Sequence, residues 1–219
     1  MFNFYGRKSP RKVNKNDLIS LFDYEFFFHH KNIKNFNKIS FGDSILNLEI
    51  GFGLGENIFR SALKAKDEFF LGCDPYLKGS LTLKKQIKQY GVKNLILTNL
   101  SFQEFFEYIN KYTFSKILIL FPDPWPKRKH MKRRIIGKTF LRSLYTICNK
   151  NSKIIISSDD VKYVEDILYK FYMDENYILS TSLFGKKLIN SFDLVETKYY
   201  KKAKKNKKKT YFFLYNVKK

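Results

Sequence analysis

Cysteine is scarce in this chain of 219 residues, which contains only Cys73 and Cys148. Both lie inside apolar runs, and two separate thiols do not form the framework of bridges seen in small secreted proteins or the ligand cluster of a cysteine zinc site. We therefore expect two buried, free thiols in a reducing compartment and no bound metal.

Long apolar runs are also missing. No stretch approaches the roughly 20 apolar residues that a helix needs to cross a bilayer. The N-terminal sequence MFNFYGRKSPRK has no continuous apolar region of the kind found in signal peptides. The sequence thus predicts a soluble, cytoplasmic protein that does not enter a membrane.

Acidic residues are few: 20 Asp and Glu stand against 42 Lys and Arg, which gives a formal net charge of +22. This excess favours a polyanionic partner, either a nucleic acid or an anionic membrane surface. The chain is also rich in Asn, Ile, Phe and Tyr, as an AT-rich genome would produce, so the placement of charge says more than its total. Arginine is rare, yet Arg128, Arg133 and Arg134 all lie within residues 127–134.

The ends of the chain differ from its middle. Residues 1–15 are a predicted basic arm, because five basic residues and two helix breakers leave them without an apolar face. Residues 16–219 are interpreted as a single domain, in which a first helix begins near Asp17 as its N-cap and runs through LISLFDYEFFFHH. A Lys-rich stretch near residues 198–209 is expected to be a loop, either solvated or in contact with nucleic acid.

From Ser44 onward, short apolar runs alternate with amphipathic stretches. The predicted buried strands are ILNLEI, EFFLGCD, NLILT, KILILF and KIIISS, and helical patterns such as NIFRSALKA and SFQEFFEYINKY lie between them. This alternation predicts an α/β fold with a doubly wound, mostly parallel sheet and helices on both faces. The late runs YILSTSLF and TYFFLYNV are expected to add an antiparallel edge.

A glycine-rich turn follows the first of these strands. Glu49 comes directly before Gly51, Gly53 and Gly55, and the next strand ends in Asp74. At the carboxyl ends of parallel strands, glycines let a ligand approach the backbone, and an acidic side chain accepts hydrogen bonds from ribose hydroxyls. The pattern predicts an adenosine-containing cofactor, although Asp74 before a proline is alternatively a turn former. The GxGxG spacing after an acid resembles the first motif of class I S-adenosylmethionine-dependent methyltransferases more than the GxGxxG turn of nicotinamide enzymes.

A proline-rich segment follows the strand KILILF. Three of the five prolines of the chain alternate with Asp123 and Trp125. Because proline restricts the backbone, we expect this loop to hold Asp123 in a fixed position, and Trp125 offers a face on which a nucleobase can stack. The residues that come next predict a phosphate-binding surface, with a solvated charged face as the alternative; they are Lys127, Arg128, Lys129, His130, Lys132, Arg133 and Arg134.

The two segments carry a family resemblance. FPDPWPKRKHMKRR, residues 121–134, resembles the signature of the bacterial tRNA (guanine-N7-)-methyltransferase family, and LEIGFGLGENI resembles the glycine motif of that family. The resemblance implies transfer of a methyl group from S-adenosylmethionine to N7 of a guanine in the variable loop of tRNA. It places Glu49, Asp74, Asn99 and Asp123 at the cofactor, with Asp123 as the catalytic aspartate.

The resemblance also implies contacts with the substrate. It places Lys127 and Asp159 at the substrate and residues 129–134 at the RNA, and it aligns Thr197-Lys198-Tyr199-Tyr200 with a C-terminal TKFE element of the family. Two positions depart from the family pattern. Asn99 stands where the family usually has Asp, and Tyr200 replaces the glutamate of TKFE.

Guanine N7 carries an in-plane lone pair and no proton, so catalysis relies on alignment and electrostatics rather than on a general base. Asp123, or as the second choice Asp159, is expected to accept hydrogen bonds from the guanine. Two rival hypotheses remain open: a nicotinamide-dependent oxidoreductase, and a non-catalytic RNA-binding protein that has kept the fold. The sequence does not decide between a monomer and a homodimer.

Overall fold

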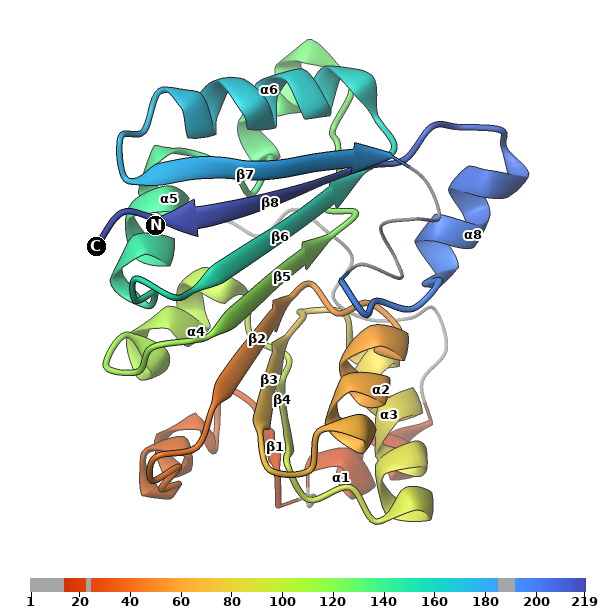
Figure 1. Ribbon diagram of the computed structural model, residues 1–219. Coiled ribbons are helices and arrows are strands. Elements are labelled where there is room, and N and C mark those ends of the chain that lie inside the picture. The colour runs from red at the N-terminus through yellow and green to blue at the C-terminus, as the bar shows by residue number, and fades with distance from the viewer. Residues whose placement is uncertain (1–13, 23–24, 185–191) are drawn as a thin grey trace. The chain divides into compact units, whose positions relative to one another are not determined.

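The computed structural model describes residues 14–22, 25–184 and 192–219, so the predicted arm at residues 1–15 lies almost entirely outside the described residues. The chain divides into two compact units, Met1–Ile109 and Asn110–Lys219. Figure 1 labels the helices and strands of both units.

The described residues of the first unit form four parallel strands. They are β1 (Phe27–Phe28), β2 (Leu46–Ile50), β3 (Phe69–Cys73) and β4 (Leu95–Thr98), in the order β1-β4-β3-β2. Leu48 of β2 pairs with Leu71 of β3, which in turn pairs with Ile96 of β4. Every residue of β2 and β4 is buried, as is typical of a parallel sheet covered on both faces.

In the part of this unit that the structure describes, the helices around these strands are α1 (Lys15–Phe22), η1 (Ile33–Lys38, a 3₁₀ helix), α2 (Glu56–Lys64), α3 (Leu77–Tyr90) and α4 (Phe102–Ile109). Figure 1 shows α1, α2 and α3 on one side of the strands and α4 on the other. Buried apolar side chains join the first group of helices to the sheet, among them Leu21 of α1, Ile58 of α2, Leu83 of α3 and Leu97 of β4.

The N-terminal helix is shorter than predicted. It begins at Lys15 rather than after Asp17, because Asn14 Oδ1 accepts a hydrogen bond from the backbone N–H of Asn16 at 2.9 Å and caps the helix. It ends at Phe22, and the aromatic run beyond it supplies β1, since Phe27 and Phe28 pair with β4. Phenylalanine favours a pleated, packed surface, so the open edge of β4 takes this run as a strand.

The second unit combines parallel and antiparallel strands. They are β5 (Lys116–Leu120), β6 (Lys153–Ser158), β7 (Tyr177–Phe184) and β8 (Tyr211–Val217), in the order β5-β6-β8-β7. β5 and β6 are parallel, whereas β8 is antiparallel to both β6 and β7. The two late β-rich runs are therefore antiparallel strands, as the sequence predicted.

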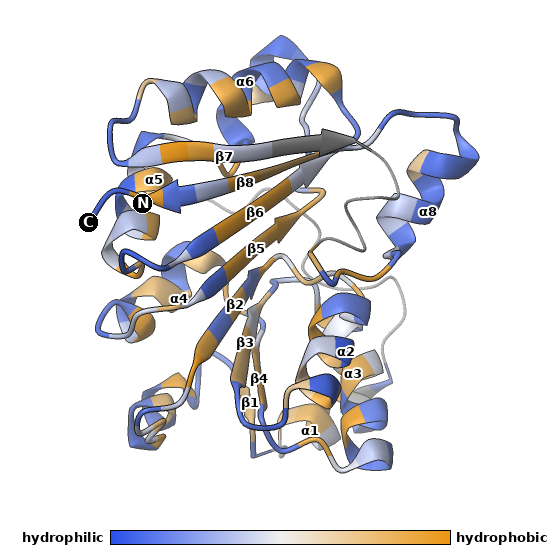
Figure 2. Ribbon diagram, viewed as in Figure 1, coloured by the Kyte–Doolittle hydropathy of each residue, from blue (hydrophilic) through white to orange (hydrophobic). Residues whose placement is uncertain are grey.

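Among its described residues, the second unit contains the helices η2 (Arg128–Arg133), α5 (Lys138–Thr146), α6 (Val161–Tyr172) and α8 (Lys198–Lys205). The Lys-rich stretch near residues 198–209 is thus not simply a loop, which corrects the prediction. The hydroxyl of Thr197 accepts a hydrogen bond from the backbone N–H of Tyr200 at 3.3 Å and caps α8, and Tyr200 and Ala203 form the buried side of this helix. Figure 2 shows α8 as mainly hydrophilic and the strands as mainly hydrophobic.

Cys73 and Cys148 are both free and buried, which confirms the expectation for the thiols. Burial raises the pKa of Cys148 to about 11, so this thiol stays neutral at physiological pH. Within the described ranges, no helix is both long enough and apolar enough to cross a bilayer.

Candidate active site

The glycine-rich turn between β2 and α2 depends on backbone conformations that glycine adopts readily. Gly51, Gly53 and Gly55 have φ angles of 75°, 59° and 80°, a region that side chains with a Cβ seldom occupy. The turn closes with a hydrogen bond of 2.8 Å from Gly55 N to Phe52 O. These glycines therefore shape a turn directly after the buried strand β2.

Asp74 fixes this turn from the end of the neighbouring strand β3. Its Oδ2 accepts a hydrogen bond from Gly53 N at 2.7 Å, and its Oδ1 accepts one from Tyr76 N at 2.8 Å. The side chain is buried, so Asp74 acts both as a turn former and as the anchor of the glycine turn. A carboxylate can accept several hydrogen bonds at once, so Asp74 can also accept one from a ribose hydroxyl.

Gly79, which the sequence analysis did not single out, brings α3 against the same turn. A Cβ at this position would lie 1.8 Å from the carbonyl oxygen of Gly53. Gly55 is similarly close to Leu83, because a Cβ there would lie 2.2 Å from a Leu83 methyl carbon. The signal in the sequence was a glycine inside an otherwise helical pattern, a position that glycine normally destabilises.

Glu49 is a buried carboxyl at the end of β2, with an exposed fraction of 3%. Burial raises its pKa to about 8, although Asn57 Nδ2 opposes this shift by donating a hydrogen bond of 2.9 Å to Oε2. A nearby cation would stabilise the ionised form of this carboxyl. Asn57 is a further site residue that sequence reasoning missed, and it lies in the first turn of the helix after the glycines.

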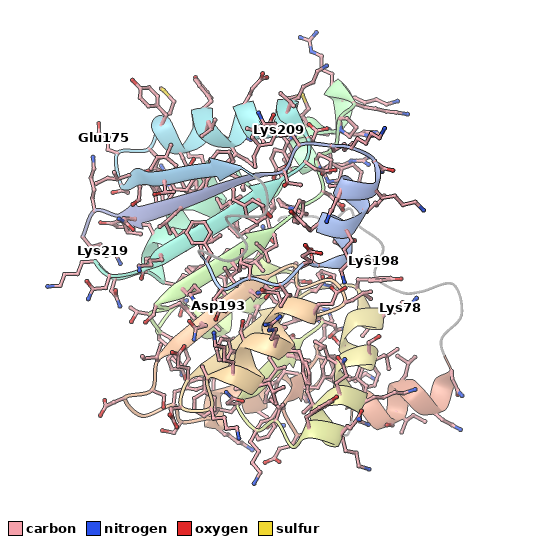
Figure 3. All side chains as sticks on the ribbon, turned by 45° about the vertical axis from the view of Figure 1, so that its right-hand side comes forward. Lys78, Glu175, Asp193, Lys198, Lys209 and Lys219 are labelled. Carbon is pink, nitrogen blue, oxygen red and sulfur yellow. The ribbon has the colours of Figure 1, made fainter. Side chains whose placement is uncertain are left out.

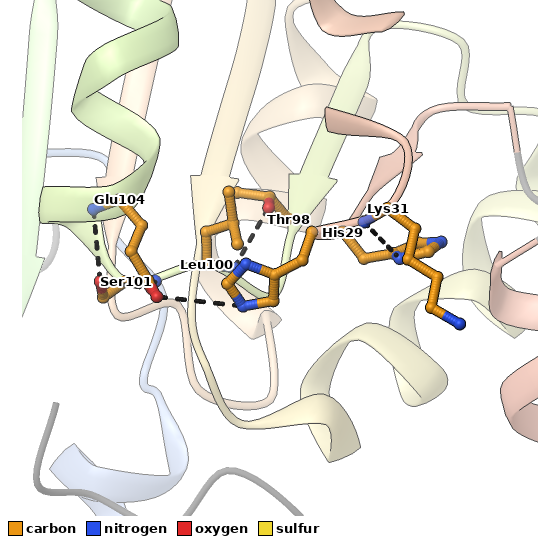
Figure 4. Close-up of polar contacts among 7 residues, drawn as sticks. His29, Lys31, Thr98, Leu100, Ser101 and Glu104 are labelled. Carbon is orange, nitrogen blue, oxygen red and sulfur yellow. Dashed lines mark hydrogen bonds and ion pairs between the residues drawn. The ribbon is translucent and has the colours of Figure 1, made fainter. Parts of the chain in front are cut away.

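Asn99 follows β4 at the same edge of the first unit. The backbone N–H groups that follow it bind to nearby side chains: Leu100 N donates to Thr98 Oγ1 at 3.2 Å, and Ser101 N donates to Glu104 Oε2 at 2.7 Å (Figure 4). The buried Oδ1 of Asn99 has no hydrogen-bond donor among the described residues. A buried acceptor without a donor is rare and suits a ligand that brings an N–H group.

The residues of the first unit fit an adenosine-containing cofactor. Asn99 offers an unused acceptor for an amino group, Asp74 has acceptor capacity for a ribose, and Glu49 offers a carboxyl that a cationic group would ionise. The glycine turn leaves its backbone open to close approach, since a Cβ at Gly51 would meet no atom within 4 Å. This donor and acceptor set matches a cofactor that is cationic and carries adenosine.

In the second unit, the proline-rich loop follows β5 and is fixed at its start. Phe121 N donates to Ser157 O at 3.0 Å and lies 3.1 Å from Ser157 Oγ. Phe121 and Trp125 have φ angles of 51° and 43°, which for bulky residues is a strained conformation of the kind found at functional sites. Asp123 lies between them, exposed to solvent, and partial desolvation by the surrounding protein raises its pKa.

Arg134 fixes the other end of the loop. Its Nε donates to Pro124 O at 2.8 Å, its Nη1 lies 3.1 Å from Asp166 Oδ2, and its guanidinium lies 4.7 Å from the centre of the Tyr163 ring. Only 1% of the side chain is exposed. This geometry corrects the assignment of Arg134 to the RNA-binding surface, because a buried guanidinium that is already paired is not available to a phosphate.

The other basic residues of this segment lie on or next to η2 and face outward. Arg133 has a different environment from Arg134: its guanidinium lies 4.9 Å from the centre of the Trp125 ring, so part of the tryptophan face is already in use. Partial desolvation and the nearby cations, Arg133 first, lower the pKa of His130, which therefore adds little positive charge at neutral pH. Four exposed cations remain, namely Lys127, Arg128, Lys129 and Lys132.

Asp159, at the end of β6, pairs with Lys208 at a distance of 3.2 Å between Oδ2 and Nζ. Its neighbour Asp160 caps α6 by accepting a hydrogen bond of 2.9 Å from Tyr163 N. The two adjacent aspartates therefore differ: Asp160 stabilises the start of α6, whereas Asp159 is partly exposed and pairs with a lysine.

The C-terminal element, residues 197–200, has two buried and two exposed side chains. Thr197 and Tyr200 are buried, the first as the cap of α8 and the second in an apolar cluster with Leu120 and Phe212. Lys198 and Tyr199 are exposed. The assignment of all four residues to the substrate stays a prediction, and for Thr197 and Tyr200 it requires contact at side chains that are buried here.

The fold defines the class of the protein. It matches that of an rRNA methylase from Streptococcus thermophilus with a TM-score of 0.55 at 10% sequence identity, over 87% of this chain and 96% of that one. The chain therefore has the Rossmann-like fold of class I methyltransferases, and the predicted doubly wound, mostly parallel sheet with an antiparallel edge is confirmed. The family described as "Putative methyltransferase" matches residues 43–213.

Two curated relatives are more specific. The chain is 32% identical to a tRNA (guanine-N(7)-)-methyltransferase of Neorickettsia sennetsu over 163 residues, which is 74% of this chain and 71% of the relative. It is 30% identical to the enzyme of that name from Wolbachia pipientis wMel over 213 residues, 97% of this chain and 91% of the relative. The chain belongs to the tRNA (guanine-N7-)-methyltransferase family, and the resemblance seen in the sequence is confirmed.

Proposed function

We propose that this chain transfers a methyl group from S-adenosylmethionine to N7 of a guanine in the variable loop of tRNA, in the cytoplasm. The observation that carries the proposal is the segment 121–134, in which a carboxylate lies on a loop fixed at both ends and next to exposed cations. Family membership supports the same chemistry.

The first unit is proposed to hold the cofactor. Glu49, Asp74 and Asn99 supply acceptors at the ends of three adjacent strands, and the glycine turn supplies an open stretch of backbone. S-adenosylmethionine supplies a methyl group on a cationic sulfur, whose carbon–sulfur bond breaks as the carbon bonds to guanine N7. The ionised form of Glu49 favours a cationic cofactor over a neutral or anionic one.

Asp123 is the proposed catalytic residue. A carboxylate can accept hydrogen bonds from guanine N1–H and from the 2-amino group, which orients N7, and its negative charge stabilises the positive charge that develops on the ring. The ring loses no proton during the reaction, so Asp123 acts by position and charge and not as a base. Its raised pKa means that acid conditions will neutralise it and weaken this effect.

Arg134 is proposed to position Asp123. Its hydrogen bond reaches the carbonyl of Pro124, the residue directly after Asp123, and the pair with Asp166 holds the guanidinium against α6. Because Phe121 N is bonded to Ser157, the loop is attached on both sides of the aspartate. Exposed lysines and Arg128 then remain to contact tRNA phosphates.

The two rival functions are less consistent with these observations. A nicotinamide-dependent oxidoreductase has no use for a fixed carboxylate beside a cationic segment, and the relatives are methyltransferases. A non-catalytic RNA-binding protein does not require the buried Glu49 or the unused acceptor of Asn99, both of which suit a cofactor.

Transfer of labelled methyl groups to unmodified tRNA tests the proposal. We expect the unaltered protein to label tRNA and the Asp123→Asn protein to bind cofactor normally but to transfer at least about 100-fold more slowly. Glu165→Gln, which removes an exposed carboxylate from α6 of the same unit, is the matched control and should transfer at the normal rate. Normal transfer by Asp123→Asn would remove Asp123 from the mechanism, and failure of the unaltered protein to label tRNA despite bound cofactor would overturn the function.

A further inference from the structure

The helix α8 carries an unusual density of one charge. Residues 198–209 contain eight lysines and no acidic residue. Figure 3 marks Lys198 and Lys209, which lie at the two ends of this segment. Among these eight lysines, Lys208 pairs with Asp159.

Four of the five lysines of α8 share one face of the helix. Tyr200 and Ala203 are buried and define the opposite face. At 100° per residue, the outward direction is that of positions 198, 201, 202 and 205. All four of these lysines are exposed, and we name them the α8 lysine face: Lys198, Lys201, Lys202 and Lys205.

This face does not serve the stability of the helix. Lysines three and four residues apart repel one another on a helix, and a lysine in the first turn opposes the helix dipole. Lys201, Lys202 and Lys205 form no ion pair with any acidic residue that the structure describes. The helix instead owes its order to the Thr197 cap and to the burial of Tyr200 and Ala203. A polyanion placed along the face would relieve this repulsion.

The position of the helix relates it to the proposed site within the second unit. Tyr200 belongs to an apolar cluster with Leu120 at the end of β5, and Phe121 packs against the same cluster. Lys208, just beyond the helix, reaches Asp159 at the end of β6. Figure 1 shows α8 beyond the arrowheads of β5 and β6. The α8 lysine face therefore lies at the edge of the sheet from which the Asp123 loop departs.

We infer that the α8 lysine face is a second RNA-binding surface, which contacts phosphates of the tRNA in addition to the segment 127–133. The inference rests on the proposed function, because it assumes that tRNA is the substrate. RNA is favoured over a lipid surface because the apolar side of α8, formed by Tyr200 and Ala203, is buried within the protein. An interfacial helix needs a free apolar face to insert, whereas binding to phosphates needs only the exposed cations.

The test compares two triple variants with the same loss of charge. K201Q/K202Q/K205Q removes three cations of the α8 lysine face, and K85Q/K88Q/K93Q removes three exposed cations from the end of α3 and the turn after it. Glutamine is a good helix former, so both variants should fold, and thermal unfolding checks this. The affinity for tRNA is measured for both as a function of salt concentration, together with the affinity for S-adenosylmethionine.

Each phosphate contact contributes about 0.7 to 0.9 to the slope of log affinity against log salt. We expect the α8 triple variant to lose about 2 from this slope and at least 10-fold in tRNA affinity at low salt, with unchanged cofactor affinity. K201R/K202R/K205R, which keeps the three charges, should have the slope of the unaltered protein. The α3 triple variant should change the slope by less than half as much.

Two results would overturn the inference. One is an equal loss of slope in both triple variants, which would reduce the effect to net charge. The other is an unchanged tRNA slope in the α8 variant. If that variant also lost binding to anionic lipid vesicles, the face would be assigned to a membrane. The proposed function fails by a different result, namely no methyl transfer to tRNA by the unaltered protein.

Discussion

The glycine turn of the first unit and the proline loop of the second unit are each held in place by a buried charged side chain, but the two side chains have opposite charges. Both follow a parallel strand, and both are held by one buried ionic side chain that bonds to the backbone. In the first, the carboxylate of Asp74 accepts from Gly53 N; in the second, the guanidinium of Arg134 donates to Pro124 O. The comparison shows that a charged residue beside a site can serve the shape of the backbone as much as the ligand.

The two regions differ in how their backbone conformation is obtained. The glycine turn relies on residues without a Cβ and on close packing against α3, whereas the proline loop relies on restricted residues and on strain at Phe121 and Trp125. The first region should therefore fail when side chains are added, and the second when its anchor is removed.

The largest expected effect is that of Gly79→Ala. Alanine normally stabilises a helix relative to glycine by up to about 1 kcal/mol, but here its Cβ would lie 1.8 Å from Gly53 O and displace the glycine turn. We expect a lower melting temperature and a loss of cofactor affinity of at least about 100-fold. Gly137→Ala is the matched control, since a Cβ there meets no atom within 4 Å. Equal behaviour of the two variants in calorimetry and titration would show that close packing does not shape the turn.

The next effect is that of Arg134→Met, which removes the anchor of the proline loop. Loss of one partner from a buried ion pair destabilises by about 3 to 5 kcal/mol when the remaining charge is unpaired; we expect about 2 because Lys170 still pairs with Asp166 at 2.7 Å. Urea unfolding measures this change. In kinetics kcat should fall while KM for tRNA changes little, and Arg134→Lys should restore part of kcat.

Arg133→Gln sharpens the same comparison. This neighbouring change should leave stability within about 0.5 kcal/mol and mainly raise KM for tRNA, because Arg133 lies over Trp125 and not in the interior. If Arg134→Met raised KM as much as Arg133→Gln and left kcat unchanged, Arg134 would be a contact for RNA and not a positioning residue.

Glu49 gives a smaller, pH-dependent effect. Its pKa of about 8 in the folded chain lies above the ordinary value of 4.5 for this side chain, so between these pH values the folded chain binds more protons than the unfolded chain. Stability contributed by this group is therefore full at low pH and falls as pH rises through about 8. A cationic cofactor favours the ionised form, so its affinity should increase several-fold from pH 7 to pH 9.

In Glu49→Gln both trends should be flat, with weaker cofactor binding at pH 9. Calorimetric titration in two buffers of different ionisation enthalpy also detects the proton released on binding. A cofactor affinity independent of pH in the unaltered protein would contradict the role given to Glu49.

The smallest effect is expected for Lys208→Gln. The ion pair with Asp159 is half exposed on the lysine side, and such pairs contribute about 0 to 1 kcal/mol. We expect the free energy of unfolding to stay within about 0.5 kcal/mol of that of the unaltered protein. A larger loss, measured by urea unfolding, would mean that Asp159 has a buried structural role comparable to that of Asp160.

Much of the fold was predictable because buried parallel strands leave continuous apolar runs, as in ILNLEI and KILILF. The start of α1 and the helix α8 were not, since a cap such as Asn14 or Thr197 and the burial of two residues outweighed the local pattern. In the site, Asp74 and the glycines were found by their spacing. Arg134 was misassigned because sequence shows charge but not burial, and Gly79 was missed because its function depends on a backbone oxygen 26 residues away.

Mapping the methylated base tests the central claim most directly. Unmodified tRNA is incubated with the protein and S-adenosylmethionine and then cleaved chemically at N7-methylguanine. We predict one new cleavage, at a guanine of the variable loop, with the unaltered protein and with Glu165→Gln, and none with Asp123→Asn in the same time. Labelled tRNA that is not cleaved at any guanine would contradict the account, because it would place the methyl group on another atom.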